Sequence, residues 1–149
     1  MRIYFDSCCL NRPYDDLRDN AVRMEAEAVL TIIDICESDS WEYFSGDVLW
    51  DELLGMSNAD KREKVLLLYH SASLHIDLTD EMVTRAKELE QFGIKSYDAL
   101  HAASAEAGNA EVILTTDRKF INAAKRSNVT IPVRNPLIWL SEVLYDAKP

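Results

Sequence analysis

The sequence predicts an α/β domain with a central, mainly parallel sheet of about five strands between two layers of helices. Short apolar runs alternate along the chain with longer stretches of helical periodicity, which is the pattern of βαβ units. Only four glycines and four prolines occur in 149 residues, which leaves little room for long loops. We see no internal repeat or linker, and therefore expect one domain over residues 1–149 with a loose tail at 146–149.

The first half of the chain is expected to form two strands and three helices. An apolar run that ends in an acid predicts a strand over Arg2–Asp6, followed by a turn to Pro13. Asn20 is a preferred N-cap residue and is expected to start a long helix to Glu37. Apolar residues recur in this helix at three- and four-residue spacing: Val22, Ala26, Val29, Ile33 and Cys36. A strand over 41–44 and helices over 48–56 and 59–69 follow.

The second half is expected to add three strands, each followed by a helix. Leu74–Leu78 alternates between apolar and polar residues, as a half-buried strand does. Thr79 is expected to cap a helix that ends near Gly93. An alanine-rich helix over 96–108 precedes a buried strand at 112–114 and a helix over 118–126. A strand over 130–133 and a helix over 137–145 complete the prediction, with Pro136 in a first-turn position.

The net charge of -10 lies entirely in the first part of the chain. Residues 1–60 hold 14 acids and 4 Lys/Arg, whereas residues 61–149 hold 12 of each. Such a chain is a poor candidate for non-specific binding to nucleic acids, which requires a basic surface. Basic residues nevertheless gather after Asp117, and a local basic patch beside an acidic cleft is compatible with the handling of a phosphodiester through metal ions.

Three cysteines, two of them adjacent at Cys8 and Cys9, argue against a disulfide framework and predict a reducing, cytoplasmic location. The first residues form a strand-like pattern rather than a signal peptide. No apolar run approaches the length of a membrane span, so we expect no membrane association.

Four acids stand where a metal site would collect them. Asp6 ends the first strand and Asp117 follows the fourth, while Asp98 lies in the first turn of the alanine-rich helix. Glu52 borders the apolar face of the helix over 48–56. Ligand sites of such sheets lie beyond the carboxyl ends of the strands, and Mg²⁺ or Mn²⁺ prefers oxygen ligands. We therefore predict a divalent metal site built from these four carboxylates.

Each acid also has a plainer interpretation. Acids at helix starts commonly cap the helix, and acids after strands commonly belong to turns. This alternative is strong for a single residue and weaker for four acids together at the sheet end. Asp51 would replace Glu52 if Glu52 faced away, and Asp47 is expected to be solvated.

Four segments, taken in order, resemble the PIN-domain ribonucleases and in particular their toxin-like, VapC-type members. The segments are Ile3-Tyr-Phe-Asp-Ser7, Asp51-Glu52-Leu-Leu54, Tyr97-Asp-Ala-Leu-His-Ala-Ala103 and Leu114-Thr-Thr-Asp-Arg-Lys-Phe120. Val133-Arg-Asn-Pro136 before a closing helix also fits, so the likeness extends over nearly the whole chain. Some members carry a further acid two residues after the fourth, where this chain has Lys119.

The resemblance implies a three-layer PIN fold and metal-dependent hydrolysis of RNA, with Asp6, Glu52, Asp98 and Asp117 as catalytic metal ligands. It implies supporting roles for Ser7 and Thr116, and RNA contacts for Arg12, Arg118 and Lys119. It also implies a homodimer and a cognate antitoxin as partners.

Two other function classes remain open. The chain could keep the fold as a non-catalytic interaction module, although the four acids argue against this. It could also be a phosphatase of the haloacid dehalogenase class, but that class needs a second aspartate where this chain has Cys8. His101 is expected to be a buried histidine with satisfied hydrogen bonds or a partner of the acids, and Cys8 a reactive thiol or a small apolar residue.

Overall fold

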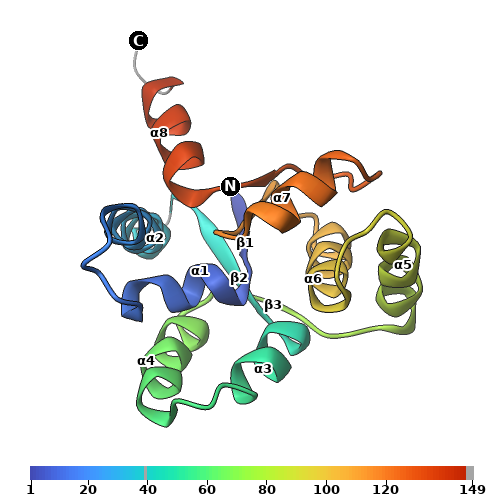
Figure 1. Cartoon of the computed structure of the whole chain (residues 1–149), viewed down its shortest axis with the longest axis horizontal. Helices are drawn as coiled ribbons and strands as arrows, with labels where there is room; N and C mark the ends of the chain where they lie inside the picture. The colour runs from blue at the N-terminus through green and yellow to red at the C-terminus, as the bar shows by residue number, and fades with distance from the viewer. Residues whose placement is uncertain (39, 147–149) are drawn as a thin grey trace.

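A computed structural model describes residues 1–38 and 40–146, and within them five strands form one parallel sheet (Figure 1). The strand order is β3-β2-β1-β4-β5. The strands are β1 Arg2–Phe5, β2 Glu42–Gly46, β3 Leu74–Ile76, β4 Val112–Leu114 and β5 Val133–Arg134. Phe5 lies opposite Leu114, and Phe44 lies opposite Leu74. The prediction of an α/β fold with a central parallel sheet of five strands is confirmed.

Helices cover both faces of the sheet (Figure 1). The helices are α1 Ser7–Asn11, α2 Asn20–Glu37, α3 Asp47–Leu54, α4 Ala59–His70, α5 Asp80–Glu90, α6 Ser96–Ala107, α7 Arg118–Lys125 and α8 Pro136–Asp146. Core residues of α1, α2, α3, α4 and α8 pack on one face of the sheet, and those of α5, α6 and α7 pack on the other. The fold is therefore a three-layer α/β/α sandwich.

The alternation of side chains along β1 divides the core between the two faces. Ile3 and Phe5 belong to the core on the α2 side, whereas Tyr4 between them belongs to the core on the α6 side. All three are at most 1% exposed. A central strand covered on both faces is uniformly apolar, as expected for a parallel sheet. Tyr4 thereby brings a hydroxyl group into the interior beneath α6.

Several boundaries differ from the sequence prediction. The expected turn after β1 is the short helix α1 and a 3-10 turn over Arg12–Tyr14, too short to show helical periodicity. Asp19, not Asn20, caps α2 through a bond from the Val22 N–H. The last strand covers Val133–Arg134 and so begins three residues later than the expected strand over 130–133. Asp146 ends α8, and the rest of the expected loose tail, 147–149, lies outside the described residues.

Among the described residues, no helix has the length and apolar character needed to cross a membrane.

Candidate active site

Two of the four predicted acids follow neighbouring strands at the carboxyl edge of the sheet. Asp6 directly follows β1, and its N–H donates to the Leu114 carbonyl at the end of β4 at 3.1 Å. Asp117 follows Leu114 by three residues and caps α7. Because β1 and β4 are parallel neighbours, their ends bring Asp6 and Asp117 to one place.

Asp6 is a buried carboxylate, with only 2% of its surface exposed. It caps α1, and its Oδ1 accepts the Cys9 N–H at 3.0 Å. The pKa of Asp6 is raised to about 6, mainly by burial and to a smaller extent by the charge of Asp98. The nearby His101 and a hydrogen bond from the Thr115 hydroxyl offset part of this rise. Hydrogen bonds thus hold the Asp6 carboxylate in place, although burial disfavours its ionised form.

The hydroxyl that supports Asp6 also supports Asp117. Thr115 is fully buried, and its Oγ1 accepts the Asp117 N–H at 3.0 Å. The Asp117 carboxylate in turn accepts the Lys119 N–H at 2.9 Å. The supporting threonine in the structure is therefore Thr115, next to the predicted Thr116. Thr115 fits because it is the first residue after the buried strand β4, whereas Thr116 is half-buried.

Glu52 is held by a hydrogen-bonded chain through the interior. Its Oε1 lies 2.9 Å from Nε2 of His101, which is 1% exposed, and the His101 Nδ1 lies 2.6 Å from the Tyr4 hydroxyl. Burial and the charges of Asp6 and Glu52 raise the pKa of Tyr4 well above its usual value. The phenol therefore keeps its proton and donates it to Nδ1, which places the imidazole proton on Nε2, facing Glu52.

Burial alone would raise the pKa of Glu52, but hydrogen bonds from His101 and Ser7 lower it below its usual value. Glu52 is therefore ionised at neutral pH, and Ser7, which was predicted to support the acids, contacts Glu52. His101 is both a buried histidine with satisfied hydrogen bonds and a partner of the site.

Asp98 lies within electrostatic range of both Asp117, which follows β4, and Glu52 on α3. It lies one turn before His101 on α6 and is half-buried. The pKa of Asp98 is raised to about 6, mainly by burial; the charges of Asp117 and Glu52 contribute to this rise, and His101 and Lys95 oppose it. Since such charge effects fall with distance, Asp98 senses acids from both the β4 end and from α3.

The thiol of Cys8 is within electrostatic range of all four acids. Burial and the charges of Asp6, Glu52, Asp117 and Asp98 together raise the pKa of Cys8 to about 12. Cys8 is therefore a protonated thiol rather than the reactive thiolate that was one interpretation of the sequence. In the sequence, the feature that places Cys8 near the site is its position two residues after Asp6.

The donor set suits a hard divalent cation. The four carboxylates are close enough to influence one another's charge, since Asp117 and Glu52 add to the larger effect of burial on the pKa of Asp98. Oxygen-only donors of this kind are those of Mg²⁺ and Mn²⁺. In the described part of the chain, the one group of three or more His, Cys, Asp or Glu residues whose ligand atoms all lie within 4.8 Å of one another is the exposed set Asp47, His75 and Asp77, so no three of the four acids are that close. Asp47 is exposed, as expected.

A family model described as PIN domain matches residues 3–126, a segment that contains all four acids. The chain belongs to the PIN-domain family.

Solved structures share the PIN fold with this chain at low identity. VapBC2 from Rickettsia felis, bound to a DNA fragment from its promoter, is 19% identical, with a TM-score of 0.60, and the match covers 91% of this chain and 98% of that one. VapBC-1 from nontypeable Haemophilus influenzae is 17% identical, with a TM-score of 0.57 and the same coverages. A Pyrobaculum aerophilum protein is 18% identical, with a TM-score of 0.53, and the match covers 95% and 90%. No curated protein matches the chain.

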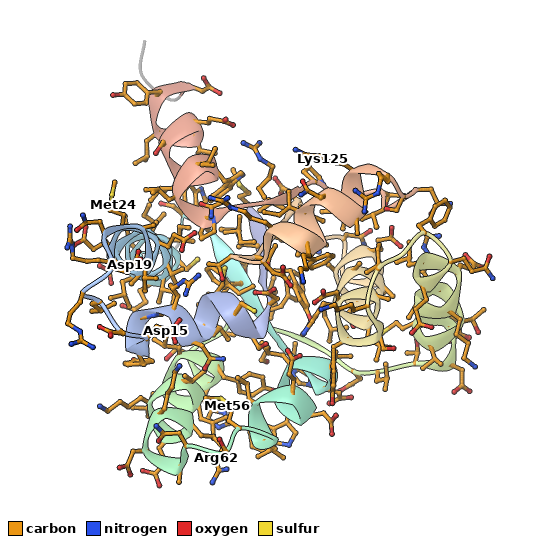
Figure 2. The ribbon with its side chains drawn as sticks, in the orientation of Figure 1. Asp15, Asp19, Met24, Met56, Arg62 and Lys125 are labelled. Atoms are coloured by element: carbon orange, nitrogen blue, oxygen red, sulfur yellow. The ribbon has the colours of Figure 1, made fainter. Side chains whose placement is uncertain are left out.

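The basic residues predicted to contact RNA differ in their surroundings. Arg118 and Lys119 are exposed at the start of α7, beside Asp117. Arg12 instead binds acids of its own chain, with NH1 3.0 Å from Asp15 and Nε 3.1 Å from Glu25, the latter as an ion pair without hydrogen-bond geometry. Figure 2 labels Asp15 below α2. Arg12 is thus the weakest of the three candidates for an RNA contact.

Proposed function

We propose that this PIN-domain protein is a metal-dependent endoribonuclease with Asp6, Glu52, Asp98 and Asp117 as its catalytic metal ligands. The observation that supports the proposal is the placement of the four acids: the Asp6 N–H binds the end of β4, which Asp117 follows, and Glu52 contacts His101 on α6, the helix that carries Asp98. Clustered carboxylates that repel one another are unfavourable without a cation, so a function that needs a cation explains why they are together.

Hydrolysis of a phosphodiester joins a water oxygen to phosphorus, breaks one P–O bond and leaves a proton on the departing oxygen. Divalent cations, Mg²⁺ or Mn²⁺, would supply Lewis acidity at the phosphoryl oxygen and a lowered pKa for the attacking water. Glu52 remains ionised because His101 and Ser7 donate to it, which suits a ligand or a group that orients water.

The other residues of the site hold the carboxylates in position. Thr115 bonds both Asp6 and Asp117, so one buried hydroxyl sets the relation between the β1 and β4 ends. The Tyr4–His101 pair sets the position of Glu52 from α3 relative to α6. Outer partners of this kind commonly change metal affinity or activity by about 10- to 100-fold when removed.

We further propose that the protein is the toxin of a toxin–antitoxin pair and forms a homodimer. Two of the solved structures with this fold are VapBC proteins, which supports an antitoxin partner. Large apolar side chains are exposed on α2, α3 and α4, which suits association: Met24, Leu30, Trp50, Leu54 and Leu67. Figure 2 shows Met24 projecting from α2.

The test is RNA cleavage by the purified full chain with Mg²⁺ or Mn²⁺, compared with EDTA. Asp98→Asn should reduce cleavage by at least about 100-fold, because it removes a charged ligand. Asp80→Asn is the matched control, since Asp80 is an exposed acid in the first turn of α5, as Asp98 is in α6. Equal cleavage by Asp98→Asn and the wild type would refute the proposal. An inactive wild type would favour the interaction module.

A further inference from the structure

A pocket of about 320 Å³ lies between α7 and the segment that leads into α6, and Asp98 is part of its wall. Its floor consists of Ile94, Phe120 and Ala123, all buried. Its rim carries three cations, Lys95, Lys119 and Arg126, and Asp98 is its single acid. The pocket therefore shares Asp98 with the proposed active site, but its lining carries an excess of positive charge.

The helical repeat of α7 explains two of these cations. Lys119, Asn122, Ala123 and Arg126 recur at three- and four-residue intervals and so share one face, which is the face that lines the pocket. Lys119 and Arg126 are separated by seven residues, or about 10 Å along the helix axis. Lys95, which precedes α6, supplies a third charge from the opposite wall.

These cations are available to a ligand. Within the described residues, no carboxylate lies within ion-pairing distance of Lys95, Lys119 or Arg126, whereas Arg12, Arg85 and Arg134 are all paired. Acids outnumber Lys and Arg by 26 to 16 in this chain. Other Lys and Arg of the described residues are also outside ion pairs, so what distinguishes these three cations is that they line one pocket together with Asp98.

We propose that this pocket binds the phosphate backbone of single-stranded RNA next to the phosphodiester that is cut. The inference rests on the proposed ribonuclease function and identifies where the substrate enters the same site. Separate cations spaced along a groove fit a chain of evenly spaced anions better than a single anion. The apolar floor of the pocket can contact sugar and base surfaces, and a single strand exposes the base faces that a duplex keeps stacked in its interior.

The position of Lys119 gives it a role in this chain. Where some relatives carry a further acid, the backbone N–H of Lys119 binds the Asp117 carboxylate while its side chain lines the pocket. The substitution thus exchanges a potential metal ligand for a phosphate contact at the boundary between the acids and the groove.

The test measures RNA binding in EDTA, so that cleavage is not needed for the readout. A fluorescein-labelled single-stranded oligoribonucleotide is titrated with the full chain, and fluorescence anisotropy is followed over a range of KCl. Lys119→Gln and Arg126→Gln should each lower the slope of log K against log[KCl] by about 0.7 and weaken binding about fivefold at about 0.1 M KCl.

Lys125→Gln is the matched control. Lys125 lies on the same helix (Figure 2) but lines a different depression, together with Ile121 and Thr130 between α7 and the approach to β5. Lys125→Gln removes one positive charge from the same helix but from outside the pocket, so the slope and the affinity should stay at wild-type values. Circular dichroism confirms that all three variants are folded.

The outcomes separate this inference from the proposed function. Wild-type slopes in Lys119→Gln and Arg126→Gln, in a protein that still cuts RNA, would overturn the pocket as the RNA site and leave the nuclease intact. Pocket-dependent binding without cleavage would support the pocket and refute the nuclease. The inference would be overturned if the wild type bound no RNA. It would also be overturned if the pocket residues bound a labelled oligoglutamate peptide instead of RNA.

Discussion

Tyr4→Phe removes one hydroxyl from the interior and tests whether the Tyr4–His101–Glu52 chain serves the site. The hydroxyl lies 2.6 Å from the His101 Nδ1, and both residues are at most 1% exposed. Without it, a buried ring nitrogen loses its donor, which costs about 1–3 kcal/mol of the free energy of unfolding. The imidazole proton is then no longer confined to Nε2, so the bond to Glu52 weakens.

We expect Tyr4→Phe to lower metal-dependent kcat/KM by at least about tenfold, the lower range for outer partners of a metal ligand. Tyr43→Phe is the matched control. The Tyr43 hydroxyl also donates across 2.6 Å, to the Leu68 carbonyl, and Tyr43 is 2% exposed, but it lies in the core on the other face of the sheet. It should lose similar stability with no change in kcat/KM.

Urea unfolding and single-turnover RNA cleavage measure the two effects. In a Glu52→Gln background, Tyr4→Phe should cause no further loss of activity, since its effect passes through Glu52. Equal activity of Tyr4→Phe and Tyr43→Phe would refute the positioning role and leave the Tyr4–His101 bond a purely structural contact.

Three further predictions follow from the same site. The pKa of Asp98 is raised from 3.8 to about 6, mainly by burial, so the folded chain binds this proton more tightly than the unfolded chain does. In EDTA, the free energy of unfolding of the wild type relative to Asp98→Asn should therefore fall as the pH rises from about 4 to about 6, by at most about 3 kcal/mol. A difference in urea unfolding that stays constant over this pH range would contradict the prediction. Thr115→Val should lower cleavage more than Thr116→Val, because Thr115 supports both Asp6 and Asp117, and the reverse order would restore the sequence prediction. Since Asp98 raises the pKa of Cys8, Asp98→Asn should speed alkylation of Cys8 by iodoacetamide at pH 8, and an unchanged rate would place Asp98 away from the thiol.

The sheet and the acids at its edge could be predicted because both depend on local pattern. Apolar runs that alternate with helical stretches predicted a parallel sheet, and the carboxyl ends of neighbouring parallel strands necessarily lie together. Asp6 and Asp117 could therefore be placed from the order of the elements alone. Asp98 and Glu52 were placed from their positions in predicted helices, and the resemblance to a family then supported the same four acids.

The supports of the acids could not be predicted because they depend on contacts between distant residues. Tyr4 and His101 are 97 positions apart, and Glu52 and His101 are 49 apart. Which of two adjacent threonines points inward depends on where β4 ends, and a one-residue shift reverses the side chain. The basic pocket likewise requires α7 to pack against the segment before α6.

The central claim is that the four acids hold the catalytic cation, and Mn²⁺ binding measured by isothermal titration calorimetry tests it most directly. Asp98→Asn should weaken binding of Mn²⁺ by at least about tenfold, while Asp77→Asn, in the exposed group with Asp47 and His75, should bind as the wild type does. Loss of binding in Asp77→Asn with wild-type binding in Asp98→Asn would contradict the claim.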